Sequence, residues 1–283
     1  MTDLASGSPL RSVLGTIAGR LAAAGCDTPR VDAEILVAHV SGIPRSELAL
    51  EQLRTLTRQE EKALRRLVTR REAREPLAYV LGEWGFRRLV LGVDRRVLVP
   101  RPETEIVVER SLARIAGLSE PRVLDVGTGS GAIALAIADE HADAEVTAID
   151  ASAGALEVAG ANALRTGLRI ELRQWDLFTG LPEGPWDLVA SNPPYVLPDE
   201  LETLEPEVRD WEPREALVGA GATEAVARGA ADVLRPGGAL VLEVAAGSAR
   251  RVTTLLRELG YAEVSTTRDL AGRDRVVEGE CGT

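Results

Sequence analysis

The chain has 283 residues, of which 45% are hydrophobic, and a net charge of −11. This length exceeds that of most single domains and can bury a sizeable core, so we expect one large domain or two unequal ones. No apolar run reaches membrane-spanning length, and the first residues lack the basic-then-apolar order of a signal peptide, which predicts a cytoplasmic protein without a membrane partner. Two distant cysteines without CxxC spacing and only two histidines argue against a disulfide framework and a metal site.

The charge is distributed unevenly along the chain. Residues 1–100 carry 16 Lys and Arg against 12 Asp and Glu, whereas residues 101–283 carry 17 against 32. The opposite signs favour two domains. The acidic second part, at −15, would repel a polyphosphate in non-specific contact.

The first 80 residues have the pattern of a small helical domain. Apolar residues recur there at the three-and-four spacing of one helix face, and Gly25 follows as a stop signal. The positions on this face are Leu10, Val13, Leu14, Ile17 and Leu21. Thr57 and Glu60 form a capping-box pair, which predicts the start of a further helix. Its later turns carry Arg65, Arg66, Arg70, Arg71 and Arg74. These arginines can form a docking patch, although the helix dipole favours cations at that end in any case.

The pattern changes at residues 84–99, WGFRRLVLGVDRRVLV. β-branched and aromatic residues flank a Gly-Val-Asp break at 92–94, which predicts a β-hairpin turning at the break, in a linker over residues 81–100. From Arg122 onward, strand-like and helix-like segments alternate. This alternation predicts an α/β fold with a largely parallel sheet and helices on both faces, and ligands of such sheets bind beyond the carboxyl ends of the strands.

A glycine-rich segment, VLDVGTGSG, follows the first strand of this α/β part. Gly127, Gly129 and Gly131 would let the backbone pass close to a ligand, although a tight strand-to-helix turn alone would also explain them. The GxGxG spacing differs from the dinucleotide pattern, and Asp125, which precedes it, would oppose a pyrophosphate but attract a cationic amine. Asp150 ends the next strand, where it could hold the hydroxyls of a ribose. S-adenosylmethionine carries such an amine, a sulfonium and a ribose, so we expect it as the cofactor.

The fourth predicted strand of this part ends in Asn192-Pro193-Pro194-Tyr195. Two prolines can simply stop a strand and stiffen a turn. The Asn192 side-chain oxygen and the Pro193 carbonyl, however, can both accept hydrogen bonds from one planar NH2 group, against which Tyr195 can pack. This arrangement suits an amide or an exocyclic amine as methyl acceptor. Such a nitrogen loses its proton readily only after methylation, so no general base has to act before transfer.

The tetrad and the glycine loop together resemble those of amino-methyltransferases, and the rest of the chain narrows the resemblance. Six segments occur in order: PLAYVLGEWGF (76–86), VLVPRPETE (97–105), VLDVGTGSG (123–131), SNPPYV (191–196), EPREALVGA (212–220) and DLAGRDRVV (269–277). They closely resemble the bacterial release factor glutamine methyltransferase family, also called HemK or PrmC. The resemblance spans nearly the entire chain.

The resemblance implies a domain order and a reaction. The fold would be a Rossmann-like class I methyltransferase sheet over residues 101–283, joined by a β-hairpin (81–100) to a helical substrate-docking domain (1–80). The reaction would be the transfer of a methyl group from S-adenosylmethionine to the side-chain amide of the glutamine in the Gly-Gly-Gln motif of class I peptide chain release factors, a protein methylation in translation termination.

The resemblance also implies roles for single residues. The cofactor would be held by Gly127, Thr128 and Gly129 at the methionine part, Asp150 at the ribose, and Trp175 with Asp176 at the adenine. The glutamine amide would be held by Asn192, Pro193 and Pro194 with Tyr195 beside it. The passage for the glutamine would be shaped by Arg101, Pro102, Glu103 and Thr104.

Local departures and two alternatives stay open. VGAGATEA after EPREAL, and the residues after Glu243, differ from the family pattern, and Glu243 itself is expected to be a structural or hydrogen-bonding carboxylate. A nucleic-acid adenine or cytosine methyltransferase would share the tetrad, but it normally needs a basic groove, which the acidic second part does not provide. A non-catalytic cofactor-binding protein would be favoured by a degraded tetrad or glycine loop, and neither is degraded. We expect release factors as partners, no direct nucleic acid, and a monomer.

Overall fold

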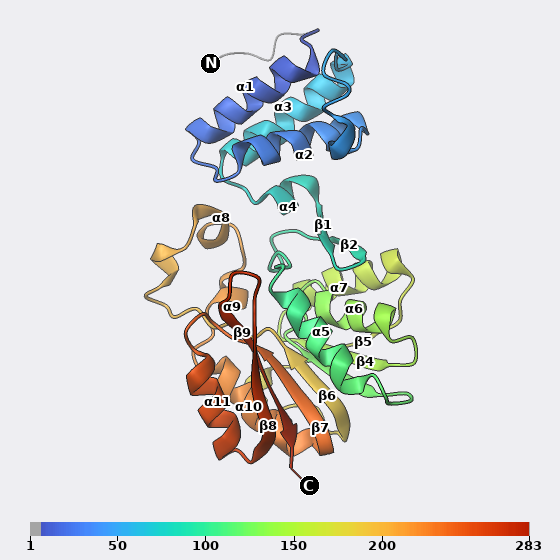
Figure 1. Ribbon diagram of the computed structural model, residues 1–283, viewed down its shortest axis with the longest axis vertical. Helices are drawn as coiled ribbons and strands as arrows, with labels where there is room; N and C mark the ends of the chain where they lie inside the picture. The colour runs from blue at the N-terminus through green and yellow to red at the C-terminus, as the bar shows by residue number, and fades with distance from the viewer. Residues whose placement is uncertain (1–6, 283) are drawn as a thin grey trace. The chain divides into compact units, whose positions relative to one another are not determined.

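The computed structural model describes residues 7–282, which form two compact units (Figure 1). The first unit comprises residues up to Gly82 together with Glu205–Trp211. The second comprises Glu83–Leu204 together with the residues from Glu212 onward. Within the described part of the chain, no helix is both long enough and apolar enough to cross a bilayer.

The first unit is helical. Its helices are α1 (Leu10–Ala23), α2 (Pro29–Ser41), α3 (Arg58–Glu72), α4 (Leu77–Leu81) and, from the distant segment, α8 (Pro206–Arg209). A short 3-10 helix spans Arg45–Glu47. The five apolar positions predicted for the first helix are all buried in the core of this unit. The predicted capping box is confirmed at the start of α3, where the Glu60 amide donates to the Thr57 hydroxyl at 3.2 Å and the Thr57 amide donates to the Glu60 carboxylate at 2.7 Å.

Three of the five arginines in the later turns of α3 and just beyond it make ion pairs inside this unit. The buried Arg71 donates from Nε to Asp32 at 2.8 Å and from Nη1 to Glu207 of α8, also at 2.8 Å. Arg74 donates from Nε to the same Glu207 carboxylate at 2.6 Å, and Arg70 pairs with Glu75. The two pairs with Glu207 attach the segment Glu205–Trp211 to the end of α3 and the residues just after it, so all three arginines serve the unit's own structure.

The second unit begins with an antiparallel hairpin. Its strands are β1 (Glu83–Phe86) and β2 (Leu89–Gly92). The turn lies at Arg87 and Arg88, so the prediction that the chain turns at residues 92–94 is wrong. Arg87 has a left-handed backbone (φ 50°), and its amide donates to Glu105 at 2.8 Å while its guanidinium donates to Glu140 at 2.7 Å. Because these contacts come from distant residues, the local sequence does not reveal the turn.

The core of the second unit is a seven-stranded sheet in the order β5-β4-β3-β6-β7-β9-β8. Its strands are β3 (Arg122–Val126), β4 (Glu145–Asp150), β5 (Glu171–Gln174), β6 (Trp186–Ser191), β7 (Leu234–Glu243), β8 (Tyr261–Arg268) and β9 (Asp274–Cys281). Strands β3 to β7 are parallel, and β9 runs antiparallel between β7 and β8. The predicted largely parallel sheet is confirmed.

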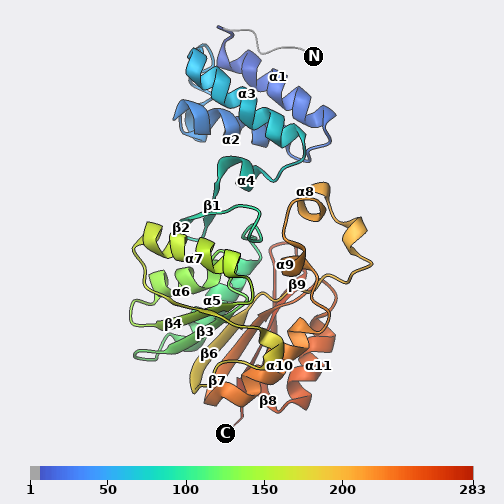
Figure 2. The same cartoon turned by 180° about the vertical axis from the view of Figure 1, so that it is seen from behind.

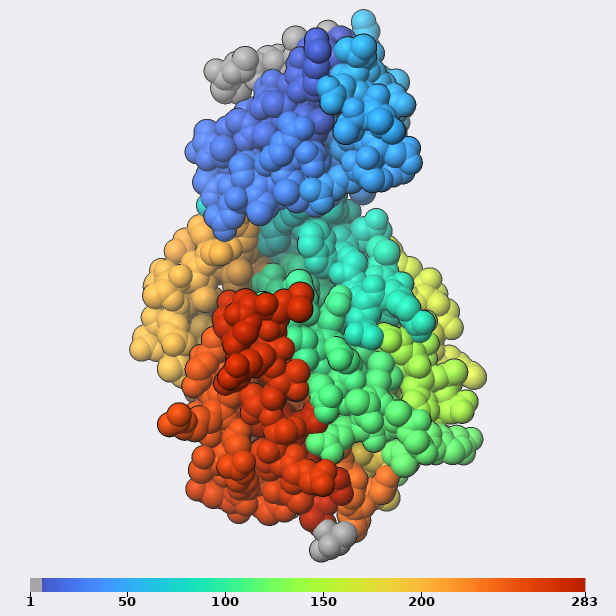
Figure 3. All heavy atoms as spheres, in the orientation of Figure 1, coloured from blue at the N-terminus to red at the C-terminus, as the bar shows by residue number. Residues whose placement is uncertain are grey.

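Helices cover both faces of the sheet (Figures 1 and 2). One face carries α5 (Thr104–Ile115), α6 (Ala132–Glu140) and α7 (Ala153–Thr166), and the other carries α10 (Ala222–Val233) and α11 (Ala249–Glu258). Short helical turns lie at Leu177–Thr179, Leu201–Thr203 and α9 (Arg214–Leu217). Figure 3 shows α5 beside the β8 and β9 strands, where Arg110 and Arg114 of α5 each donate to the buried Glu278 of β9 at 2.8 Å. These bonds fix α5 relative to the sheet.

Candidate functional site

A cavity of about 380 Å³ lies at the carboxyl ends of β3, β4, β5 and β6. Its volume falls within the roughly 300–1,000 Å³ of ordinary small-molecule sites, and its place is where ligands of parallel sheets bind. Of the residues singled out by sequence, its lining includes Gly127, Gly129, Asp150, Trp175, Asp176, Asn192 and Pro194. Four chain segments that are separate in sequence therefore meet at one cavity.

The glycine loop forms one wall of this cavity. The Gly127 and Thr128 amides both donate to the Ile149 carbonyl, at 2.9 and 3.0 Å, which ties the loop to the end of β4. Gly127 and Gly129 have φ of 74° and 55°, and a Cβ added to either would meet no atom within 4 Å. Here the left-handed backbone, not crowding, requires glycine, and the backbone is open to a ligand. Gly131 also has a left-handed backbone (φ 82°), and in addition its Cβ would lie 3.1 Å from a methyl group of Leu135 in α6.

Asp125 is completely buried at the end of β3. Its Oδ2 accepts from the Thr128 hydroxyl at 2.6 Å and from the Ala134 amide at 3.2 Å. Its Oδ1 has no hydrogen-bond partner among the described residues. Burial raises the pKa of this carboxyl to about 7, against the opposing effect of the two hydrogen bonds. A buried carboxylate with one unsatisfied oxygen fits a cationic group, such as the amine of S-adenosylmethionine.

Asp150 and the residues after β5 form the neighbouring wall. Asp150 accepts from the Gly129 amide at Oδ2 and from the Ser152 amide at Oδ1, each at 2.9 Å, and burial raises its pKa. The Trp175 amide donates to the Asp150 carbonyl at 3.0 Å, and its indole donates to the Gly180 carbonyl at 2.8 Å. The Trp175 side chain is therefore anchored at its nitrogen, and the residue lines the cavity.

The end of β6 is held by a chain of hydrogen bonds. Asn192 donates from Nδ2 to the Thr104 hydroxyl at 3.1 Å, and Thr104 donates to Oε2 of Glu243 at 2.6 Å. Tyr195 donates its hydroxyl to Oε1 of the same carboxylate at 3.2 Å. Burial, together with Glu243, raises the pKa of Tyr195, and burial raises the pKa of Glu243. Glu243 is thus a hydrogen-bonding carboxylate, as expected from the sequence, and it lies at the end of β7, the strand adjacent to β6.

The four residues Arg101 to Thr104 have different surroundings. Arg101 donates to Glu212 at 2.6 Å, whereas Thr104 is buried and faces Glu243. Pro102 and Glu103 line a second cavity, of about 510 Å³, between the start of α5 and the β8–β9 turn. Glu103 accepts from Arg273 of that turn at 3.3 Å. Pro193 and Tyr195, together with Asp125, Thr128 and Gly131, lie outside the lining of the first cavity.

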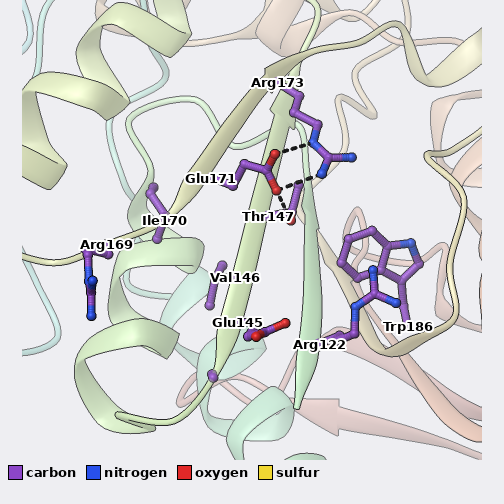
Figure 4. A pocket seen from close by; sticks show the side chains of 10 residues that line it. Arg122, Glu145, Val146, Thr147, Arg169, Ile170, Glu171, Arg173 and Trp186 are labelled. Carbon is purple, nitrogen blue, oxygen red and sulfur yellow. Dashed lines mark hydrogen bonds and ion pairs between the residues drawn. The ribbon is translucent and has the colours of Figure 1, made fainter. Parts of the chain in front are cut away.

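A further hollow, of about 390 Å³, lies where β3, β4 and β6 begin (Figure 4). Three of its polar side chains pair with one another: Arg173 donates to Glu171 at 2.7 Å, and the Thr147 hydroxyl donates to the same carboxylate at 3.2 Å. The guanidinium of Arg122 lies 4.8 Å from the centre of the Trp186 ring. Between β5 and β6 the chain forms only the short helical turn Leu177–Thr179. The strand β5 beside this turn carries mostly polar residues. None of the residues predicted to be functional lines this hollow.

Comparison with known proteins identifies similar chains. Residues 12–82 match the family described as "PrmC N-terminal domain", and residues 104–204 match the "Methyltransferase small domain". A release factor glutamine methyltransferase from Caulobacter vibrioides is 40% identical over 266 residues, which is 92% of each chain. One from Cereibacter sphaeroides is 44% identical over 269 residues, 91% of this chain and 93% of the relative.

Two solved structures share the fold. A methyltransferase from Pyrococcus furiosus is 19% identical, with a TM-score of 0.51 over 68% of this chain and 89% of that one. The T. thermophilus 16S rRNA N2 G1207 methyltransferase, in complex with AdoMet and guanosine, is also 19% identical, with a TM-score of 0.52 over 70% of this chain and 49% of that one. These similarities confirm the expected methyltransferase sheet.

Proposed function

This chain belongs to the family of release factor glutamine methyltransferases, and on that premise we propose that it methylates the side-chain amide of the glutamine in the Gly-Gly-Gln motif of class I peptide chain release factors. The observation that carries this proposal is the similarity to such enzymes over about nine-tenths of both chains. The acceptor chemistry agrees, since the end of β6 carries an Asn-Pro-Pro-Tyr tetrad beside the cavity. The nucleic-acid alternative has no support from these relatives.

S-adenosylmethionine, when bound, supplies a methyl group on a positively charged sulfonium. We assign the loop Gly127–Gly129 to its methionine part, Asp125 to the amine, and Asp150 to the ribose. Trp175 and Asp176 would border the adenine. The unsatisfied oxygen of Asp125 and the open backbone of the glycine loop support this assignment.

The tetrad would bind and orient the glutamine amide. The Asn192 side-chain oxygen and the Pro193 carbonyl would each accept one amide hydrogen, with Tyr195 packed beside the amide plane. Arg101 to Thr104 would shape the passage by which the glutamine enters. Holding both hydrogens directs the nitrogen lone pair, and positioning of reacting groups can lower a barrier by roughly 7–11 kcal/mol. The amide proton would leave after transfer, once the nitrogen is positive, so the tetrad need not act as a base.

We further propose that the helical unit docks the release factor and that the chain acts as a monomer in the cytoplasm, where translation terminates. The match of residues 12–82 to the "PrmC N-terminal domain" family supports a role for this unit that is specific to these enzymes.

The first test is methyl transfer itself. Purified protein would be incubated with methyl-labelled S-adenosylmethionine and a class I release factor, in parallel with the same factor carrying Gln→Ala in its Gly-Gly-Gln motif. We expect label on the intact factor alone. Label on both factors, or on neither while the cofactor binds, would refute the proposed target.

The second test concerns the tetrad. Asn192→Ala is expected to abolish transfer while cofactor affinity, measured by calorimetry, stays nearly unchanged. Loss of cofactor binding in this variant would contradict the role assigned to Asn192.

A further inference from the structure

We propose that Glu243 is a positioning residue, which acts through Thr104 to fix which end of the Asn192 amide faces the substrate. This inference rests on the proposed function, because it takes Asn192 as the group that holds the glutamine amide. It adds a residue from β7 that lies outside the lining of the cofactor cavity and meets the tetrad at the Tyr195 hydroxyl, at 3.2 Å.

The direction of the hydrogen bonds follows from the donor and acceptor capacity of each group. An ionised carboxylate can only accept, and both oxygens of Glu243 are engaged, one by Thr104 at 2.6 Å and the other by Tyr195 at 3.2 Å. A threonine hydroxyl has a single hydrogen, which here goes to Glu243. Towards Asn192 the same hydroxyl can therefore only accept.

Asn192 must consequently present its NH2 end to Thr104, and this is the observed bond, at 3.1 Å from Nδ2. The amide oxygen then points away from Thr104 and is free to accept a hydrogen from an incoming NH2 group. The reverse orientation would place the amide oxygen against a hydroxyl oxygen whose only hydrogen is already committed to Glu243, which gives no hydrogen bond. One buried carboxylate thus determines whether the end of β6 can hold an amide nitrogen.

The surroundings of Glu243 make the chain of hydrogen bonds sensitive to protonation. Glu243 is 1% exposed, and it is faced by Thr104 and Glu103 from the start of α5, by Tyr195 after β6 and by Arg275 of β9. Burial raises its pKa above the ordinary glutamate value, while the two hydrogen bonds and Arg275 oppose that shift. A protonated Glu243 becomes a donor, and the direction of the hydrogen bonds is no longer fixed.

The test replaces the carboxylate by its isosteric amide. In Glu243→Gln, the new NH2 group can donate to Thr104, which can then donate to the Asn192 oxygen and so reverse the amide. We expect kcat to fall about 10- to 100-fold, the scale of one unsatisfied polar group in a closed site, with cofactor affinity and the unfolding temperature little changed. In addition, the decline of kcat at acidic pH and saturating cofactor should be present in the parent protein and absent from this variant.

Position 104 supplies the matched controls. Thr104→Val keeps the shape but removes the hydroxyl, whereas Thr104→Ser keeps the hydroxyl, so the serine variant should lose much less kcat than the valine variant. The double variant with Thr104→Val and Glu243→Gln should have nearly the same kcat as Thr104→Val alone, because the loss of the hydroxyl has already broken the series of hydrogen bonds.

The outcomes separate this inference from the proposed function. If the parent protein methylates the release factor and Glu243→Gln has the parent's kcat, the positioning role is refuted while the function stands. The positioning role is also refuted if Thr104→Val and Thr104→Ser are equally active. It is likewise refuted if a loss of folded protein fully accounts for the lower kcat of Glu243→Gln and Thr104→Val. If the parent protein transfers no methyl group, it is the proposed function that fails.

Discussion

Replacing the buried Asp125 by asparagine should stabilise the protein above neutral pH and weaken its binding of the cofactor. The neutral amide can retain the present contacts, since its oxygen can accept from Thr128 and Ala134 as the carboxylate does. What it removes is a buried negative charge, one oxygen of which has no partner among the described residues. The variant therefore separates the stability that this carboxylate costs from the affinity that it provides.

The size of the effect follows from the shift in the pKa of Asp125, from 3.8 to about 7. Because the pKa is raised on folding, the folded state binds the proton more tightly, and the associated stability, complete below pH 3.8, is lost as the pH rises to about 7. At roughly 1.36 kcal/mol per unit this amounts to about 4 kcal/mol, an upper value because a hydrated site relaxes around the charge. At pH 8 the Asp125→Asn variant avoids this cost, whereas at pH 5 the parent carboxyl is already mostly neutral.

The measurement is urea unfolding of both proteins at pH 5 and pH 8. We expect the free energy of unfolding of Asp125→Asn relative to the parent to rise by about 2–4 kcal/mol between the two pH values. Calorimetry with S-adenosylhomocysteine at pH 8 should show about 10- to 100-fold weaker binding, as the loss of a charge-assisted hydrogen bond predicts. An equal stability difference at both pH values would show that Asp125 has an ordinary pKa in the folded protein and would refute the reasoning.

Two further changes test the ion pairs of Glu207 and the packing of Gly219 against Pro194. Glu207→Gln should lower the free energy of unfolding of the helical unit by about 1–3 kcal/mol, because Arg71 loses one of its two charged partners. The control, Glu205→Gln, is at an exposed position on the same segment and should change this free energy by less than about 0.5 kcal/mol. Equal effects of the two changes in urea unfolding would contradict a structural role for the ion pair. Gly219→Ala should lower kcat about 10-fold or more in a protein that remains folded, since its Cβ would lie 2.6 Å from the Pro194 carbonyl oxygen; unchanged kcat would mean that the tetrad tolerates displacement.

Periodicity and local motifs predicted much of the architecture. The apolar face of α1, the capping box of α3 and the parallel sheet all follow from spacing within short windows, and each is present. The carboxyl-edge cavity followed from the alternation of strands and helices, which places the loops after β3, β4, β5 and β6 together. The helix face and the capping box depend on neighbours in sequence, whereas the sheet and the cavity follow from the regular order of the segments, and both kinds of pattern can be read from the sequence.

The features that sequence did not reveal depend on distant contacts. The hairpin turns at Arg87 because Glu105 and Glu140 hold its backbone and side chain, and neither lies within the hairpin. Thr104 and Glu243 are 139 residues apart, so no local pattern links them. Their alignment depends on the packing of α5 against the sheet, which only the folded chain defines.

The grouping of Glu205–Trp211 with the helices bears on how enzymes of this kind can be recombined. The chain passes from one unit to the other three times, at Gly82, Leu204 and Trp211, so the helical unit is not a contiguous cassette. A chimaera that exchanges only the first 82 residues would pair a foreign α3 with the original Glu207, and the acceptors of Arg71 and Arg74 would no longer be matched. Exchanging the helical unit between relatives therefore requires grafting two stretches of sequence, of which the second lies inside the sequence of the other unit.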